Sequence, residues 1–305
     1  MRRIWEKSSG YDFWRHYVDF CTRASFSSVE ISGLERMPRD GAVLLAPNHR
    51  AALMDPLLVL LLRKGPTGFG ARADIFRKPR MAAILRWLRI LPLARERDGL
   101  QAVSKNWEIF DEIIDCLAHG VPFCMFSEGT HRAERGMMPV KKGLFRIAKM
   151  ACDKLEGPVW VVPVGIDYDY FFRQGGRAAV RIGEPLDMRK AFSSDKPEGD
   201  IYHELCAELQ ERDLALIDRL PEREHGRIAL RLLGALPLLP LYPVFALASV
   251  PIWLPASIIL SRFEDKAWSH TVYYACRLLL PVFLPFYYIF SIIHNYFANL
   301  ITDLK

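Results

Sequence analysis

Short apolar runs alternate with helical patterns from residue 41 onward, and this rhythm constrains the fold more than any other feature of the chain. The apolar run GAVLLAPN at 41–48 precedes a helical pattern at 56–63, and TGFGARAD follows at 67–74. Such alternation predicts an α/β fold. Later strand candidates are VPFCMFSEGT at 121–130, VWVVPVGIDY at 159–168 and RAAVRIGEPL at 177–186, the last with the alternation of a half-exposed strand.

Two further helices are expected in this part of the chain. One spans about 101–119 and stops at Gly120, and the other spans 201–220 after a loop at 195–200. The first helix has one apolar face, which comprises Val103, Trp107, Phe110, Ile114 and Leu117.

The N-terminal segment combines apolar and basic residues over a predicted helix at 11–25. This mixture suits a helix lying on a membrane surface, and a helix packed on the domain explains it equally well. The segment has no long apolar stretch, so no cleavable signal peptide is expected. The residues concerned are Trp14, Tyr17, Val18 and Cys21 beside Arg2, Arg3, Lys7, Arg15 and Arg23.

The composition changes near the C-terminus. Leu236 to Leu260 is a stretch of 25 residues without Asp, Glu, Lys, Arg or His, long enough to cross a hydrocarbon core of roughly 30 Å. Five prolines interrupt it, so a kinked, broken or re-entrant segment is expected. A second apolar stretch at about 278–300 follows a polar link, and the pair predicts a membrane hairpin. Two buried helices of a soluble bundle are the alternative.

Basic residues indicate how this hairpin is oriented. Arginines at 219, 223, 227 and 231 precede it, whereas the link carries Arg262 and Lys266. Because positive residues stay on the cytoplasmic side, the catalytic part is expected to face the cytoplasm, at a bacterial inner membrane or the endoplasmic reticulum. The six cysteines lack paired short spacings, so we interpret them as reduced thiols, in agreement with that side.

The formal net charge of +6 favours an anionic partner, which could be phospholipid, a phosphorylated substrate or nucleic acid. Residues 75–95 hold six basic residues and no acid, interleaved with apolar ones. A helix of this kind can press its apolar face into lipid headgroups, and a solvated basic face is the alternative. Arg95 and Arg97, after a turn at Pro92, are the expected phosphate ligands. The six basic residues are Arg77, Lys78, Arg80, Arg86, Arg89 and Arg95.

The segment APNHRAALMDP at 46–56 follows an apolar strand and contains a possible base. His49 can take a proton from a hydroxyl while Asp55 holds the imidazole tautomer and stabilises the imidazolium. Such a pair activates an alcohol without a covalent enzyme intermediate. Taken alone, this pattern is more often a helix cap or a satisfied surface pair.

The turn FSEGTHR at 126–132 can hold an anion. Gly129 lets backbone N–H groups approach a phosphate, and Arg132 supplies charge. Glu128 would repel an anion, so it is expected to orient a basic neighbour or to bind acceptor hydroxyls. An ordinary polar turn is the alternative.

The segment MMPVKKGLFRIAK at 137–149 places Lys141 and Lys142 before a predicted helix. Cations at a helix N-terminus add to its dipole and favour an anion there. A plain helix start explains the same residues.

These groups, in this order, resemble the motifs of the glycerolipid acyltransferase superfamily, which includes glycerol-3-phosphate and 1-acylglycerol-3-phosphate acyltransferases. The resemblance covers roughly residues 30–190 and includes Pro163, which matches the fourth motif. It implies an α/β acyltransferase fold with a mixed sheet flanked by helices, to which the two apolar stretches add the expected C-terminal transmembrane or re-entrant helical hairpin. The expected parts are a surface helix at 1–25, an acyltransferase domain at 26–225 and a membrane hairpin at 226–305, with segments at about 236–260 and 278–300.

The resemblance also implies roles for residues. His49 would be the general base, and Asp55 would support it. No metal and no cofactor are implied, and the donor would be the thioester of acyl-CoA or acyl carrier protein. The acceptor would be glycerol-3-phosphate or a lysophospholipid at a phospholipid membrane, with no nucleic acid as partner. The expected substrate-binding residues are Arg95, Arg97, Glu128, Gly129, Thr130, Arg132 and Lys141.

Two features depart from the family pattern. Most members have four residues between His and Asp, whereas His49 and Asp55 have five between them, which resembles the fungal-type glycerol-3-phosphate acyltransferases. An offset of six separates two side chains by about 240° on a regular helix, so a non-helical turn must bring them together. Ser127 replaces the usual Pro of the third motif and loosens that turn.

Two other functions fit parts of the sequence. A lipid hydrolase would need a nucleophile, but no GxSxG motif occurs and Cys124 has no obvious activated setting. A non-catalytic protein that binds anionic membranes would explain the basic segment but not His49, Asp55 and Glu128.

Overall fold

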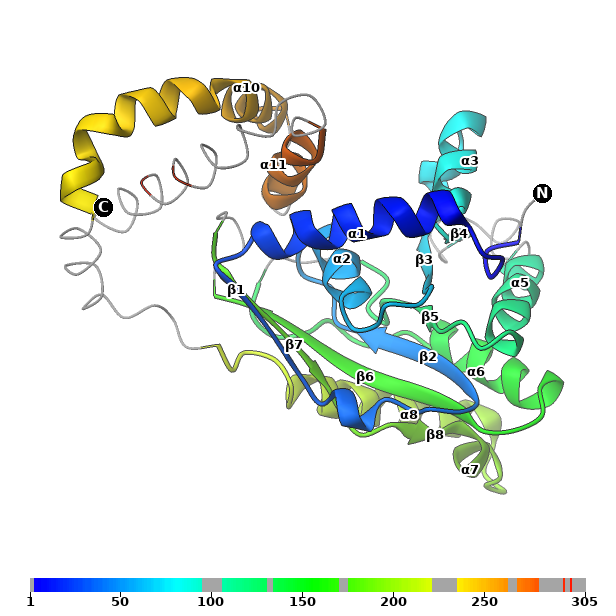
Figure 1. Ribbon diagram of the computed structural model, residues 1–305. Helices are drawn as coiled ribbons and strands as arrows, with labels where there is room; N and C mark the ends of the chain where they lie inside the picture. The colour runs from blue at the N-terminus through cyan, green and yellow to red at the C-terminus, as the bar shows by residue number, and fades with distance from the viewer. Residues whose placement is uncertain are drawn as a thin grey trace.

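A mixed eight-stranded sheet forms the centre of the computed structural model, which describes residues 3–94, 106–130, 134–169, 175–220, 235–262, 268–279, 293 and 297 (Figure 1). The strand order is β1-β7-β6-β2-β5-β3-β4, with β8 beside β6. β6 runs antiparallel to β7 and β8, and the other pairs are parallel. The predicted mixed α/β sheet is confirmed. The strands are β1 (Ser28–Ser32), β2 (Ala42–Pro47), β3 (Gly68–Arg72), β4 (Ile90–Leu93), β5 (Phe123–Cys124), β6 (Val159–Tyr168), β7 (Arg177–Ile182) and β8 (Leu186–Asp187).

Helices cover both faces of the sheet. Successive side chains of a strand point to opposite faces, and along β2 Leu44 packs with α5, α6 and α8 while Leu45 packs with α1 and α2. The His49–Asp55 motif, which directly follows β2, is therefore attached to a sheet that is buried on both faces. The helices are α1 (Ser9–Ala24), α2 (Met54–Leu60), α3 (Pro79–Trp87), α5 (Asn106–Ala118), α6 (Gly143–Lys154), α7 (Met188–Phe192), α8 (Glu198–Leu214), α10 (Tyr242–Leu260) and α11 (Trp268–Leu279), with short 3₁₀ turns η1 (Leu34–Arg36), η2 (Ala73–Phe76) and η4 (Leu236–Leu241).

The basic segment forms a shorter helix than predicted. α3 ends at Trp87, and the chain continues as β4, which pairs with β3. Pro92 lies inside β4 and does not form the predicted turn. The sheet tolerates it because β4 is the edge strand, where a missing N–H costs no ladder bond.

Other predicted details also need correction. Trp107 is 58% exposed and does not join the buried face of α5. β7 is largely buried, not half-exposed, because β1 pairs along its outer edge and Leu216 lies over Gly183 at its end. α8 already begins at Glu198, within the predicted loop.

The C-terminal segment bends where its prolines predict. No single described helix has the length and hydropathy of a membrane span, and Tyr242–Pro251 with Trp253–Leu260 meets that requirement only as a pair bent by 61°. Pro251 and Pro255 lie inside α10 and remove helical hydrogen bonds. α11 begins at Trp268, within the predicted polar link, and packs against α10. Most of the predicted second stretch lies outside the described residues.

Candidate active site

The turn between β2 and α2 holds the first motif. β2 ends at Pro47, and α2 begins at Met54. Between them, Ala52 has a positive φ of 41°, which L-residues adopt rarely. His49 Nδ1 then lies 2.7 Å from Asp55 Oδ2. The expected non-helical turn is confirmed, and the left-handed residue accommodates the longer spacing.

Asp55 is fully buried and accepts several hydrogen bonds. Its Oδ2 accepts from the His49 ring and from the amides of Arg50 at 2.6 Å and Ala51 at 2.8 Å. Its Oδ1 accepts from the Tyr168 hydroxyl at 2.6 Å. An ionised carboxylate only accepts hydrogen bonds, so the proton of a neutral His49 resides on Nδ1. Nε2 is then the nitrogen that can receive a proton.

Glu128 holds the backbone of the site. Its Oε1 accepts from the His49 amide at 2.7 Å, and its Oε2 accepts from the Met138 amide at 2.8 Å. Burial raises the pKa of Glu128, and the two backbone donors offset part of that rise. Both oxygens therefore bind backbone N–H groups, one of which belongs to the basic neighbour His49. A contact of Glu128 with acceptor hydroxyls stays a prediction.

The 126–130 turn lies beside the His49 ring. Phe126 stacks on the imidazole with ring centroids 4.1 Å apart. Gly129 has a φ of +70°, which a glycine adopts without strain. The Lys141 amide donates to Ser127 O at 2.8 Å, and Lys141 Cγ lies 3.8 Å from the position of a Cβ on Gly129. The structure thus places the exposed Lys141 side chain at the turn next to His49.

The remaining predicted ligands cannot all be placed. Thr130 follows Gly129 in this turn and is half-buried. Arg95, Arg97 and Arg132 lie outside the described residues, so their contact with a phosphate stays a prediction.

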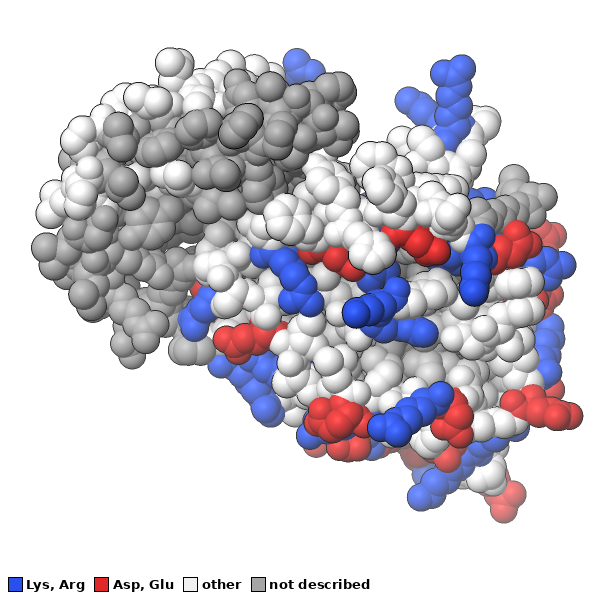
Figure 2. All heavy atoms as spheres, in the orientation of Figure 1, with Lys and Arg blue, Asp and Glu red and all other residues white. Residues whose placement is uncertain are grey.

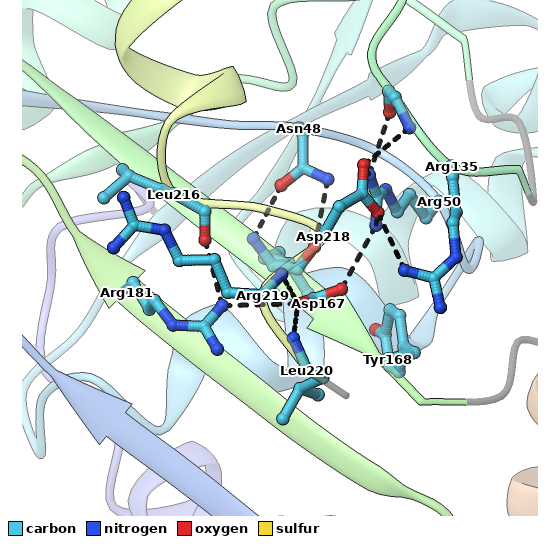
Figure 3. Close-up of polar contacts among 12 residues, drawn as sticks. Asn48, Arg50, Arg135, Asp167, Tyr168, Arg181, Leu216, Asp218, Arg219 and Leu220 are labelled. Carbon is cyan, nitrogen blue, oxygen red and sulfur yellow. Dashed lines mark hydrogen bonds and ion pairs between the residues drawn. The ribbon is translucent and has the colours of Figure 1, made fainter. Parts of the chain in front are cut away.

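A buried ionic network lies behind the His49–Asp55 pair, and the sequence analysis did not identify it. Arg50 is 1% exposed, and its guanidinium contacts Asp167 at 3.3 Å and Asp218 at 3.0 Å (Figure 3). The same group donates to Gly136 O at 3.0 Å. Asp167 in turn accepts from the Leu220 amide at 2.8 Å. Arg50 therefore joins the motif turn to the 134–138 segment and to the chain after α8.

Two of the predicted membrane-facing cations have other partners. Arg86 forms an ion pair with Glu112 at 2.7 Å. Arg89 is buried and donates to the carbonyl groups of Ile4 and Glu6. Three exposed cations remain at the start of α3, and these are Arg77, Lys78 and Arg80.

The surroundings of the cysteines bear on whether one of them could serve as a nucleophile. All six cysteines are free, as predicted, and burial raises the pKa of the Cys124 thiol well above its ordinary value. This thiol is therefore not an activated nucleophile. Within the described parts of the chain, no three His, Cys, Asp or Glu residues are grouped so that they could hold a metal ion.

The comparisons with known proteins concern the same region. A family model described as Acyltransferase matches residues 28–167, a range that contains His49, Asp55 and Glu128. The solved structures include a similar chain titled 1-acyl-sn-glycerophosphate (LPA) acyltransferase, PlsC, from Thermotoga maritima. It has 25% sequence identity and a TM-score of 0.47, over 69% of this chain and 83% of that chain. No curated protein matches this chain.

Proposed function

We propose that this chain, which an acyltransferase family model matches over residues 28–167, moves a fatty acyl group from a thioester to a phosphate-bearing glycerol lipid precursor. The donor is acyl-CoA or acyl carrier protein, and the acceptor is glycerol-3-phosphate or a lysophospholipid. The observation that carries the proposal is the 2.7 Å hydrogen bond between His49 and the buried Asp55.

The chemistry follows from the free imidazole nitrogen. His49 Nε2 takes the proton of an acceptor hydroxyl as its oxygen attacks the thioester carbonyl. The C–S bond breaks, and the imidazolium returns the proton to the leaving thiolate. Asp55 stabilises the imidazolium between these steps. Holding both substrates in line removes much of the entropic barrier.

The acceptor phosphate requires cations near the base. Lys141 lies beside the 126–130 turn, and its exposed side chain supports this role. Arg95 and Arg132 are the further ligands that the sequence predicts. An ammonium and a guanidinium both bind phosphate oxygens, the latter through paired N–H groups.

Exposed apolar side chains support a membrane surface as the place of reaction. α1 exposes Phe13, Trp14 and Phe20, and α3 exposes Met81, Ile84 and Trp87. The two helices lie next to each other, since the rings of Tyr11 and Trp87 are 6.1 Å apart. Figure 2 shows basic side chains at the outer end of α3, where anionic headgroups would bind them. We place the site on the cytoplasmic side, from the arginines that precede the C-terminal segment.

Labelled acyl thioester and a panel of acceptors with and without phosphate test this function. His49→Ala should reduce transfer by about 10²–10⁴-fold while the protein stays folded and membrane-bound. His203→Ala, an exposed histidine on α8, is the matched control and should leave transfer unchanged. Near-normal turnover of His49→Ala would contradict the mechanism. Equal use of acceptors without phosphate would contradict the acceptor class, and release of free fatty acid without transfer would indicate a hydrolase.

A further inference from the structure

The two oxygens of Asp55 have different partners. Oδ2 accepts from His49 and from two backbone amides, whereas Oδ1 accepts from the Tyr168 hydroxyl at 2.6 Å. Both side chains are buried, at 0% exposure for Asp55 and 1% for Tyr168. Tyr168 therefore contacts the side of the carboxylate that points away from the imidazole.

We propose that Tyr168 is a positioning residue for the acyl transfer, which acts through Asp55 on the basicity and orientation of His49. This inference rests on the proposed role of His49 as general base. The Tyr168 hydroxyl donates to Asp55, and Asp55 in turn bonds to the imidazole, so the proposed effect passes through this carboxylate.

Three contacts of the surrounding fold hold Tyr168 in place. It is the last residue of β6 and pairs with Ala178 of β7. Its ring lies 6.0 Å from that of Phe26. The preceding residue, Asp167, is tied to Arg50 in the buried network. The strand, the ring contact and the adjacent ion pair therefore hold the Tyr168 hydroxyl in the position from which it donates to Asp55.

The Tyr168 hydroxyl keeps its proton at neutral pH and therefore remains a hydrogen-bond donor. Burial raises the pKa of Tyr168 well above its ordinary value, and the charge of Asp55 and the hydrogen bond to it act in the same direction. Arg50 opposes that rise and Asp167 adds to it. His49 itself is bonded to two carboxylates, with its ring on Asp55 and its amide on Glu128, and the cations nearest to it in the chain and at the 126–130 turn are Arg50 and Lys141.

The effect on His49 has a defined sign. A hydrogen bond from Tyr168 stabilises the charge on the Asp55 carboxylate and so weakens its attraction for the imidazolium. Without this donor the carboxylate attracts the imidazolium more strongly, and His49 keeps its proton to higher pH. The carboxylate also loses the contact that holds Oδ1, so the imidazole is oriented less well.

The test compares Tyr168→Phe with Tyr202→Phe. Tyr202 is a matched control, because its hydroxyl also donates to a carboxylate, that of Glu198, at the far side of the sheet on α8. Tyr168→Phe should lower kcat by about tenfold with little change in the acceptor KM, since one hydrogen bond to a charged group is lost. The acid limb of its kcat/KM profile should move to higher pH. Tyr202→Phe should match the wild type in all three measurements.

Two results separate this inference from the proposed function. If His49→Ala is inactive and Tyr168→Phe keeps kcat within about twofold and an unmoved acid limb, the inference is wrong and the function stands. If His49→Ala is active, the function itself fails.

A second variant covers the case in which thermal melting shows that Tyr168→Phe is unfolded. Incorporation of 3-fluorotyrosine at position 168 keeps the hydroxyl and makes it a stronger donor. The acid limb should then move to lower pH, and an unmoved limb would overturn the inference.

Discussion

At the scale of single residues, Ala52 shows how the long His49–Asp55 spacing is accommodated. Its positive φ of 41° costs an L-residue about 1 kcal/mol, and glycine avoids that cost. Ala51 is also buried, at 1% exposure against 8% for Ala52, and has no positive φ. We expect the free energy of unfolding of Ala52→Gly to exceed that of Ala51→Gly by about 1 kcal/mol, because both lose a buried methyl group and only one relieves the backbone. Urea denaturation measures both, and an equal or smaller value for Ala52→Gly would show that the turn is unstrained.

Single residues also show what a sequence predicts about a site. His49 and Asp55 share one short motif, so their pairing could be predicted as soon as a non-helical turn was required. Tyr168 lies in a predicted strand, but its contact with Asp55 depends on the register in which β6 pairs with β2. Arg50 was not predicted because charged side chains are rarely buried without partners, and those partners are distant in sequence.

At the scale of elements, α8 buries an acidic residue, Asp213, against the sheet. Burial raises its pKa well above the ordinary value, the carboxylate of Glu128 adds to the rise, and the Val164 amide offsets it only in part. A carboxyl whose pKa is raised on folding contributes stability below its unfolded pKa of about 3.9. That contribution is lost as pH rises through the folded pKa.

Asp213→Asn should therefore gain stability relative to the wild type as the pH rises. Asparagine does not titrate, so the wild type alone loses stability through this position. Urea unfolding at pH 5 and pH 8 gives the difference at each pH, with Asp200→Asn, an exposed residue of α8, as the control. A difference between Asp213→Asn and wild type that does not change with pH would mean that Asp213 does not titrate on folding.

The strands whose bounds were predicted best are those buried on both faces. β2 and β6 are continuous apolar runs in the middle of the sheet, and their sequences indicate strands without help from their neighbours. β1 and β4 were not predicted. Both are edge strands with short sequences that mix apolar and polar residues. Such strands form because their backbone pairs with a neighbouring strand, and their own sequence pattern does not identify them.

At the scale of the whole molecule, the N-terminal helix packs on the domain, which is one of the two interpretations that its sequence left open, and it also exposes apolar side chains. Cys21 is buried against the sheet, whereas Phe13 is 71% exposed. α11 packs against both α1 and α10, and Tyr17 donates to Leu278 O at 3.0 Å. α1, α3, α10 and α11 therefore form connected parts of one side of the molecule (Figure 1). If this side meets the membrane, lipid contacts should be confined to it.

Photocrosslinking in vesicles tests whether lipid contacts are confined to this side of the molecule. The crosslinker reports contacts at each labelled position, whether or not the C-terminal segment is inserted in the membrane. We expect benzoylphenylalanine at Phe13 and Ile84 to form lipid adducts in anionic vesicles, because both side chains are exposed on the proposed membrane side. Leu34 and Leu214, at 47% and 43%, are nearly as exposed as Ile84 at 53%. They lie on η1 and α8, and α8 packs on the opposite face of the sheet from α1. Adducts at these two positions should be severalfold fewer by mass spectrometry. Equal yields at all four positions, or none at Phe13 and Ile84, would contradict a membrane face built from α1 and α3.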